Sequence, residues 1–181
     1  MVLINTMKQE IQISIRDVYE GLIETREIFL NPFSENLEIH NFCVSSIFRD
    51  WEVMDDRDRL LETQAVPINN RRDWYYAVSL IDPVLPGRKF TVKMRGRLDQ
   101  RYFEMTTVNR EDLYFWQISH TSVRKSELIY QIRLSDSFRL VHVQGQQPGT
   151  QDHNQASWEI PLSEGQFFNP VVVYRKVNPS G

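Results

Sequence analysis

The segment from residue 73 to residue 98 constrains the fold most strongly, because it contains two runs of strand-forming residues separated by a turn. The first run, residues 74–82, is rich in aromatic and branched side chains and ends at Pro83, which has no amide hydrogen for a sheet. The second run begins after Pro86 and Gly87, a pair typical of turns. We therefore expect two neighbouring strands that pair as a hairpin.

The second run has apolar residues on one face and cations on the other. Successive side chains alternate sides along a strand, so Phe90, Val92 and Met94 face one way. The intervening positions are mostly basic and face the other way: Lys89, Thr91, Lys93, Arg95 and Arg97. These cations would follow one another at steps of about 7 Å, a spacing suited to a series of phosphates.

Six cations lie between positions 88 and 101, against the single acid Asp99, and we refer to them as the basic row: Arg88, Lys89, Lys93, Arg95, Arg97 and Arg101. The whole chain has a formal net charge of −3, so this basic segment contrasts with an acidic remainder. We interpret the basic row as the candidate phosphate- or anion-binding site. The alternative is that its charges protect a sheet edge from pairing with another sheet.

Length and composition indicate one folded domain. The chain has 181 residues, of which 41% are hydrophobic and 12% aromatic, enough to bury a substantial core. We expect a single domain over residues 1–181, with a helix-containing part at about 1–66 and a β-rich part at about 73–177. The small net negative charge argues against a protein that is basic over its whole surface, as many nucleic-acid binders are.

Two helices are predicted in the N-terminal third, after a short strand at residues 11–15. The first would begin at Asp17, where a capping carboxylate precedes Glu20, and end at Asn31. The second would span about residues 41–54, where apolar side chains recur at helical spacing: Val44, Ile47, Phe48, Trp51 and Met54.

The remainder of the chain has the alternating pattern of strands. Turn-forming clusters separate predicted strands at residues 102–108, 113–119, 127–134, 137–143, 158–160 and 171–177. The fold class predicted from the sequence is therefore α+β: a mainly antiparallel sheet or flattened sandwich of about six to eight strands, with the two helices.

Motifs for common chemistries are missing from the sequence. Seven glycines are scattered singly, so they form neither a phosphate-binding loop nor a dinucleotide fingerprint. Cys43 is the only cysteine, which excludes an intramolecular disulfide and favours a packing role. The four histidines do not pair at metal-ligand spacing: His40, His120, His142 and His153. We expect no catalytic residues, no metal and no cofactor.

The sequence also bears on the compartment. The first residues lack the charge pattern of a signal peptide, and no apolar run approaches the length of a transmembrane segment. With a single cysteine, a reducing compartment is the simpler interpretation. We expect a cytoplasmic or nuclear protein, or a virion component if the source is viral.

One remote enzymatic alternative is a metal-dependent nuclease. Asp82 at a strand end and Lys93 in the next strand resemble the hairpin on which some nucleases hold magnesium. Thr91 stands where a second carboxylate is needed, and Glu104 would have to compensate from a neighbouring strand.

We therefore expect a non-catalytic, self-assembling structural or interaction protein of matrix or coat type. It would form homo-oligomers and contact an anionic partner, either a membrane surface or a nucleoprotein, through the basic row. The alternative is a module that binds single-stranded nucleic acid such as RNA. In that case Tyr75, Tyr102 or Phe103 would stack on bases, although core packing is the commoner role of such side chains.

Overall fold

The computed structural model describes residues 6–17, 20–45, 48–67, 73–98, 113–118, 120–121 and 125–177. All regular elements within these ranges are β-strands, and fifteen strands form one sheet of seven, two of three and one of two. The predicted α+β class with two helices and a single sheet or sandwich of six to eight strands is therefore wrong. The mainly antiparallel arrangement is confirmed, since among the described pairs only β1 with β10 is parallel.

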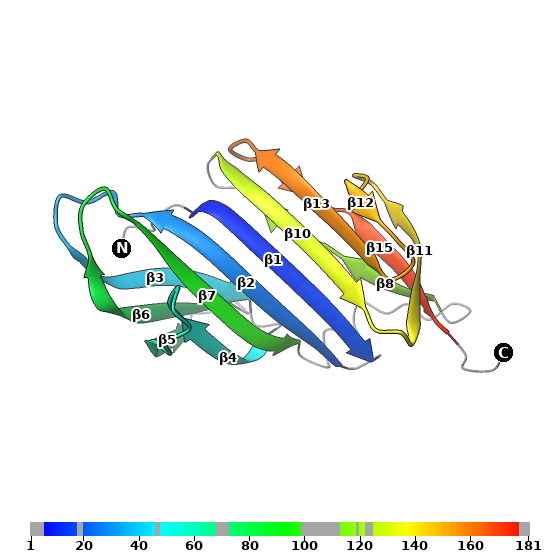
Figure 1. The fold of residues 1–181 in the computed structure, drawn as a ribbon, viewed down its shortest axis with the longest axis horizontal. Coiled ribbons are helices and arrows are strands. Elements are labelled where there is room, and N and C mark those ends of the chain that lie inside the picture. Colours follow the sequence, from blue (N-terminus) through cyan, green and yellow to red (C-terminus); the bar gives the residue numbers. More distant parts are fainter. Residues whose placement is uncertain are drawn as a thin grey trace.

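The seven-stranded sheet runs the length of the molecule (Figure 1). Its strands, in spatial order, are β12 (Thr150–Gln151), β13 (Gln155–Leu162), β10 (Ser126–Leu134), β1 (Thr6–Asp17), β2 (Glu20–Leu30), β7 (Lys89–Leu98) and β4 (Phe48–Met54). The strand predicted at residues 11–15 is confirmed as part of β1, at the centre of this sheet.

Three smaller sheets complete the fold. One contains β3 (Leu37–Ser45), β6 (Asp73–Val84) and β5 (Glu62–Pro67), and another contains β11 (Phe138–Gln144), β15 (Val171–Lys176) and β8 (Leu113–Gln117). The two-stranded sheet pairs β14 (Phe167–Phe168) with β9 (His120–Thr121). The strands predicted at residues 113–119, 127–134, 137–143, 158–160 and 171–177 all correspond to observed strands, whereas residues 102–108 lie outside the described ranges.

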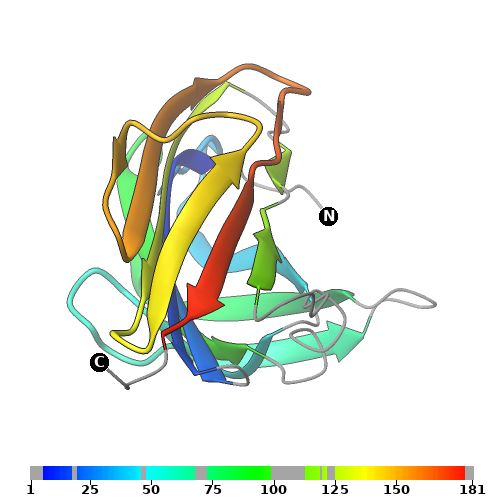
Figure 2. The same cartoon turned by 90° about the vertical axis from the view of Figure 1, so that its right-hand side faces the viewer.

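The two three-stranded sheets pack on the same face of the seven-stranded sheet, one toward each end (Figures 1 and 2). Alternation explains this layering, because Ile23 and Phe29 of β2 point to one side and belong to different core clusters. The larger cluster lies between β1, β10, β13 and the β11-β15-β8 sheet; the smaller lies between β2, β7 and the β3-β6-β5 sheet. We call this packed side of the seven-stranded sheet the inner face and the opposite side the outer face.

Aromatic rings fill much of the larger core. Trp158 and Phe168 lie 5.7 Å apart between ring centroids, and Tyr130 contacts both at 6.1 and 5.9 Å. The buried polar atoms of these rings have partners: the Trp158 indole donates to the Gln146 carbonyl at 2.9 Å, and that of Trp116 donates to the Tyr130 hydroxyl at 3.1 Å. Most aromatic residues of the C-terminal half therefore serve packing.

The first predicted helix is wrong because the segment forms strand β2. Its buried side is the alternating series Gly21, Ile23, Thr25, Glu27 and Phe29, and two of these five residues are polar. The partly exposed side carries Leu22, Ile28 and Leu30. Since apolar residues lie on both faces and polar ones are buried, the period of two is hidden and a helical stripe emerges from the sequence.

The second predicted helix is wrong because its described residues, 41–45 and 48–54, belong to two strands, β3 and β4. In β4 the register shifts between Arg49 and Glu52, and Asp50 has a positive φ of 53°. Such a bulge inserts an extra residue and breaks the alternation of the strand. Trp51 and Val53 both contact the smaller core, at the two-residue spacing of a strand. The helical spacing in the sequence arose from combining positions of two separate strands.

The predicted hairpin of residues 73–98 is half correct. Both runs are strands, β6 and β7, and a turn at residues 85–88 joins them. They do not pair with each other: β6 lies between β3 and β5, whereas β7 lies between β2 and β4. The turn therefore carries the chain from one layer to the other.

Candidate anion-contact surface

Strand β7 has the orientation that its alternation predicted. Val92, Met94 and Leu98 are buried on the inner face, and the cationic positions lie on the outer face, where Arg95 and Arg97 are exposed. The register places Arg95 opposite Glu24 of β2, and Lys93 opposite Arg26. The outer face of this strand is therefore the place to look for an anion site.

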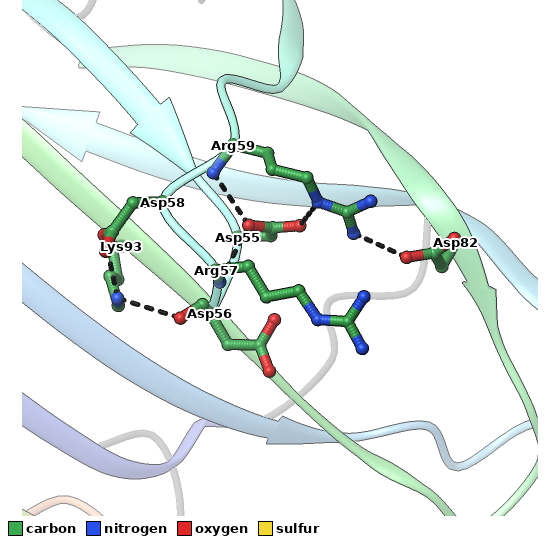
Figure 3. Close-up of polar contacts among 7 residues, drawn as sticks. All are labelled: Asp55, Asp56, Arg57, Asp58, Arg59, Asp82 and Lys93. Atoms are coloured by element: carbon green, nitrogen blue, oxygen red, sulfur yellow. Dashed lines mark hydrogen bonds and ion pairs between the residues drawn. The ribbon is translucent and has the colours of Figure 1, made fainter.

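The middle of the basic row is neutralised by carboxylates of the chain itself. The Arg95 guanidinium donates from Nε at 2.9 Å and from Nη2 at 2.8 Å to Oε1 of Glu24. Lys93 Nζ lies 2.8 Å from the Asp58 carboxylate and donates to the Asp56 carbonyl at 3.0 Å (Figure 3). These two cations already have anionic partners and contribute less to a foreign anion.

The connector between β4 and β5, residues 55–59, provides the partners of Lys93 (Figure 3). Asp55 organises it by accepting the amides of Arg57 and Arg59, each at 2.9 Å, and the Arg59 Nε at 2.6 Å. The second arm of the Arg59 guanidinium reaches Asp82 of β6 at 2.5 Å. The connector is thus a tied turn that links β6 to β7, rather than the freely solvated segment that its charges suggest.

Proton affinities in the connector follow from these bonds. Partial burial opposes ionisation of Asp55, but hydrogen bonds from the Arg59 amide and guanidinium and from the Arg57 amide outweigh it and lower the pKa of the carboxyl. The hydrogen bond to Asp82, followed by that to Asp55, raises the pKa of Arg59. Each group is therefore held in its charged form.

Cations at the ends of the row remain available. Within the described ranges, the side chains of Arg88, Lys89 and Arg97 make no hydrogen bond or ion pair, and all three are exposed. Arg88 immediately precedes β7, Lys89 is its first residue, and Arg97 lies near its other end. Arg101 lies outside the described residues, so the structure brings together five members of the basic row and leaves three of them open.

Several other charges of the outer face are also paired within the chain. Lys8 lies 3.5 Å from Glu10 and 3.8 Å from Glu127, and Glu10 also contacts Arg26 at 3.3 Å. A depression of about 450 Å³ crosses these strands and is lined by such paired groups, among them Glu10, Glu24, Arg26, Lys93 and Arg95. Because its donors and acceptors are matched within the chain, this depression is close to neutral overall.

Two further depressions lie at the ends of β7. One, of about 340 Å³, is lined by Arg88 and Lys89 together with the apolar Ile81, Leu85 and Phe90. The other, of about 640 Å³, combines Arg16, Arg95 and Arg97 with three carboxylates, Glu20, Asp50 and Glu52. The first has two open cations, Arg88 and Lys89, and one open acid, Asp56, since its Asp55 and Asp82 are bound to Arg59, whereas the second has Arg97 against the open acids Asp50 and Glu52.

The described residues do not test the proposed base-stacking role of Tyr75, Tyr102 and Phe103. Tyr75 lies in β6, opposite Cys43 of β3 and Val66 of β5, but its side-chain environment is not among the described features. Tyr102 and Phe103 lie outside the described residues. The nuclease hypothesis loses its shared hairpin, because Asp82 and Lys93 belong to different sheets and are bound to Arg59 and Asp58.

In the part of the chain that the structure describes, three or more His, Cys, Asp or Glu side chains nowhere gather to hold a metal ion. His40 is buried between the two layers, and burial lowers its pKa to about 4. Burial also lowers the pKa of His120, while His142 lies beside Gln144 on the exposed side of β11. No helix among the described residues could span a membrane.

Sequence reasoning missed one buried acid, Glu27 of β2. Its carboxylate accepts from Gln9 Nε2 at 2.8 Å and from the Thr6 hydroxyl at 3.2 Å, both on β1. Burial raises the pKa of Glu27, and these two hydrogen bonds only partly offset it. The signal in the sequence was its place in the alternating series with Ile23 and Phe29, which the helical interpretation concealed.

Comparisons with known proteins establish a fold and no family. No family model and no curated protein matches the chain. Among solved structures, yeast LTA4 hydrolase in complex with bestatin has a TM-score of 0.58 at 11% identity, over 93% of this chain and 28% of that one. An M1 zinc metallopeptidase from Deinococcus radiodurans has a TM-score of 0.56 at 7% identity, over 95% of this chain and 42% of that one.

A third similar structure, a putative nutrient binding protein from Legionella pneumophila, has a TM-score of 0.57 at 9% identity, over 95% of this chain and 67% of that one. At such low identities the likeness concerns the fold alone. The fold thus recurs as part of longer chains, and the present chain spans less than half the length of the LTA4 hydrolase and of the M1 zinc metallopeptidase.

Proposed function

We propose that the protein is a non-catalytic interaction protein that contacts an anionic partner through Arg88, Lys89 and Arg97. The observation that carries this proposal is the contrast between these three open cations and the paired charges around them. A cation without a partner in its own chain has its full charge to offer to a ligand. The contact is therefore strongest at the two ends of β7.

The fold supports an interaction role in a second way. The two three-stranded sheets cover the inner face of the seven-stranded sheet, and no other described sheet packs on the outer face (Figure 1). A broad exposed face of this kind offers a surface for a partner without requiring a deep pocket. The likeness to parts of longer chains agrees with this role, because such parts normally pack against neighbours.

We also propose that the protein self-assembles, and the structure bears on which surfaces of two copies would meet. At one edge of the large sheet, β13 exposes Glu159 and Pro161 beyond the short β12; at the other, β4 carries the bulge at Asp50. Charge, proline and bulges all discourage strand pairing between copies. We therefore propose association through sheet faces. Light scattering during size-exclusion chromatography would contradict this if the protein stays monomeric at high concentration.

Retention on an anionic chromatography resin tests the cation contact. The triple variant Arg88→Ala, Lys89→Ala and Arg97→Ala should elute at clearly lower salt than the wild type. A matched control removes three exposed cations elsewhere, Lys125, Arg133 and Arg175, and thus changes net charge equally. If the two variants elute together, net charge rather than the proposed surface governs retention and the proposal fails.

A further inference from the structure

Two loops meet at one end of the molecule, beside the start of β7. The first is residues 31–36, between β2 and β3, and the second is residues 85–88, between β6 and β7 (Figure 1). Backbone bonds join them: the Asn31 amide donates to the Arg88 carbonyl at 3.0 Å, and the Gly87 amide donates to the Asn31 carbonyl at 3.0 Å. We call this paired structure the loop tip.

Asn31 holds the loop tip in one arrangement. Only 1% of this residue is exposed, and its Nδ2 donates to the Val84 carbonyl at 2.7 Å and to the Glu35 carbonyl at 3.0 Å. Its Oδ1 accepts the Phe33 amide at 3.0 Å. Gly87 allows the turn, since its φ of 67° is strained for other residues. The backbone that carries the displayed side chains is therefore held in one arrangement.

The loop tip displays apolar and cationic side chains together. Leu85 is 55% exposed and Ile81 is 49% exposed, although both are large and apolar. Arg88 and Lys89 follow Leu85 after Pro86 and Gly87 and line the same depression of about 340 Å³. Glu35 is the only acid within the two loops; of the three acids that line the depression, Asp55 and Asp82 are bound to Arg59, and Asp56 is exposed. The loop tip and the adjoining Lys89 therefore place two open cations beside an exposed apolar side chain.

We propose that the loop tip docks on an anionic membrane surface, with Leu85 entering the bilayer interface and Arg88 and Lys89 meeting lipid phosphates. This inference rests on the proposed function and names its partner. Cations alone would suit any polyanion, whereas an exposed leucine gains nothing from a polyanion. A bilayer offers both an anionic surface and an apolar layer beneath it, and so matches both features at once.

Co-sedimentation with lipid vesicles tests the proposal on the full chain. The wild type should bind vesicles of phosphatidylcholine mixed with phosphatidylserine, and bind phosphatidylcholine alone much more weakly. Leu85→Ser should lower the partition coefficient about tenfold, the effect of losing one buried leucine. The double variant Arg88→Ala and Lys89→Ala should lower it about thirtyfold, since each cation near an anionic surface contributes about fivefold.

Controls separate docking from general effects. Val141→Ser removes an exposed apolar side chain on β11, at the other end of the molecule, and should leave binding unchanged. Arg133→Ala with Arg175→Ala removes two exposed cations, the first aligned with the Arg97 end of β7 and the second in the β11-β15-β8 sheet. Leu85→Phe keeps a large apolar side chain at this position and should bind the vesicles at least as tightly as the wild type. Circular dichroism and thermal melting confirm that each variant is folded.

The possible failures are distinguishable. If Leu85→Ser binds vesicles like the wild type, or if no vesicle binds while single-stranded RNA does, the membrane inference is overturned. The proposed function would still stand in that case if the triple variant at Arg88, Lys89 and Arg97 elutes from the anionic resin at lower salt than its matched control. Vesicle binding that is unchanged in the Arg88→Ala and Lys89→Ala double variant would also overturn the membrane inference. If the triple variant and its control then elute together from the anionic resin, the proposed function fails as well.

Discussion

The ring of His40 lies 4.2 Å from the ring of Phe29, measured between centroids, and this contact joins the β3-β6-β5 sheet to the seven-stranded sheet. Phe90 of β7 approaches the same imidazole at 5.2 Å, edge to face. His40 is 0% exposed, so a proton added there would create a charge inside the smaller core. The stability of this layer contact therefore depends on pH.

We predict that acidification weakens the fold through His40. Its pKa falls from 6.5 to about 4 on folding, so the folded state binds fewer protons than the unfolded state between these values. The stabilisation is fully present above pH 6.5 and is lost as the pH falls toward 4, by about 3 kcal/mol at most. Urea unfolding at a series of pH values in this window measures the slope.

The variant His40→Phe isolates the contribution of this residue. It keeps an aromatic ring beside Phe29 but has no titrating group, so its stability should fall less steeply between pH 6.5 and pH 4. Because other groups titrate in the same range, the difference between variant and wild type is the relevant quantity. Parallel curves for the two proteins would show that His40 is not the source.

Glu27 should show the opposite dependence. Burial raises its pKa, so its contribution to stability is present at low pH and is lost as the pH rises through the folded-state value. The variant Glu27→Gln removes the charge and can still accept the Gln9 amide through its oxygen. We expect Glu27→Gln to be more stable than wild type at neutral pH, with the advantage shrinking on acidification.

A comparison with Glu24→Gln controls for the change in net charge. Glu24 lies on the outer face of the same strand and forms an ion pair with Arg95. That variant should not gain stability at neutral pH. If Glu27→Gln is less stable than wild type in urea unfolding at neutral pH, the carboxylate contributes more through its hydrogen bonds than burial costs it, and the prediction is wrong.

The behaviour of β2 and β7 shows which parts of this fold could be predicted from the sequence. In β7 the apolar side chains Val92 and Met94 lie on one face and the charges on the other, so the local pattern is sufficient. In β2 the buried face includes Thr25 and Glu27, and tertiary packing rather than local pattern makes it a strand. Helical propensity of the isolated segment could not reveal this.

The sequence could not predict which strands pair or which charges form ion pairs, because both depend on tertiary packing. Whether β6 pairs with β7 depends on which layer each joins, and that choice is made by the two cores together. Likewise Glu24 and Arg95 are 71 residues apart in the chain, so only the strand register brings them together. The basic row was visible in the sequence, but its internal neutralisation was not.

Asn31→Ala should destabilise the protein and loosen the loop tip. The substitution removes three side-chain hydrogen bonds and leaves the partly buried carbonyl of Val84 without the Asn31 donor. We expect a loss of about 2–3 kcal/mol, given about 1 kcal/mol for each bond. Urea unfolding measures the total, and hydrogen exchange at the amides of Phe33 and Gly87 reports the local loosening.

The matched control is Asn36→Ala, in the same loop. Asn36 is exposed, and its side chain makes no hydrogen bond to the described residues, so its loss should change stability by less than about 0.5 kcal/mol. Equal effects of the two substitutions would mean that Asn31 has no special role in holding the loops.

Removing the internal partners of the basic row should strengthen binding to anions. The double variant Glu24→Gln and Asp58→Asn frees Arg95 and Lys93 from their carboxylates while leaving the cations in place. Each freed cation should raise the affinity for anionic vesicles by about fivefold if it reaches the surface. Because these pairs are partly exposed, the free energy of unfolding should change by less than about 1 kcal/mol.

A control with the same net charge is Glu159→Gln with Asp136→Asn, which removes exposed acids away from β7. Adding Arg95→Ala to Glu24→Gln should cancel the gain from that site, since the freed cation is then gone. If the control binds anionic vesicles as strongly as the Glu24 and Asp58 double variant, binding follows total charge. The ion pairs within the basic row would then not affect the affinity for anionic vesicles, because β7 would not be the surface that contacts them.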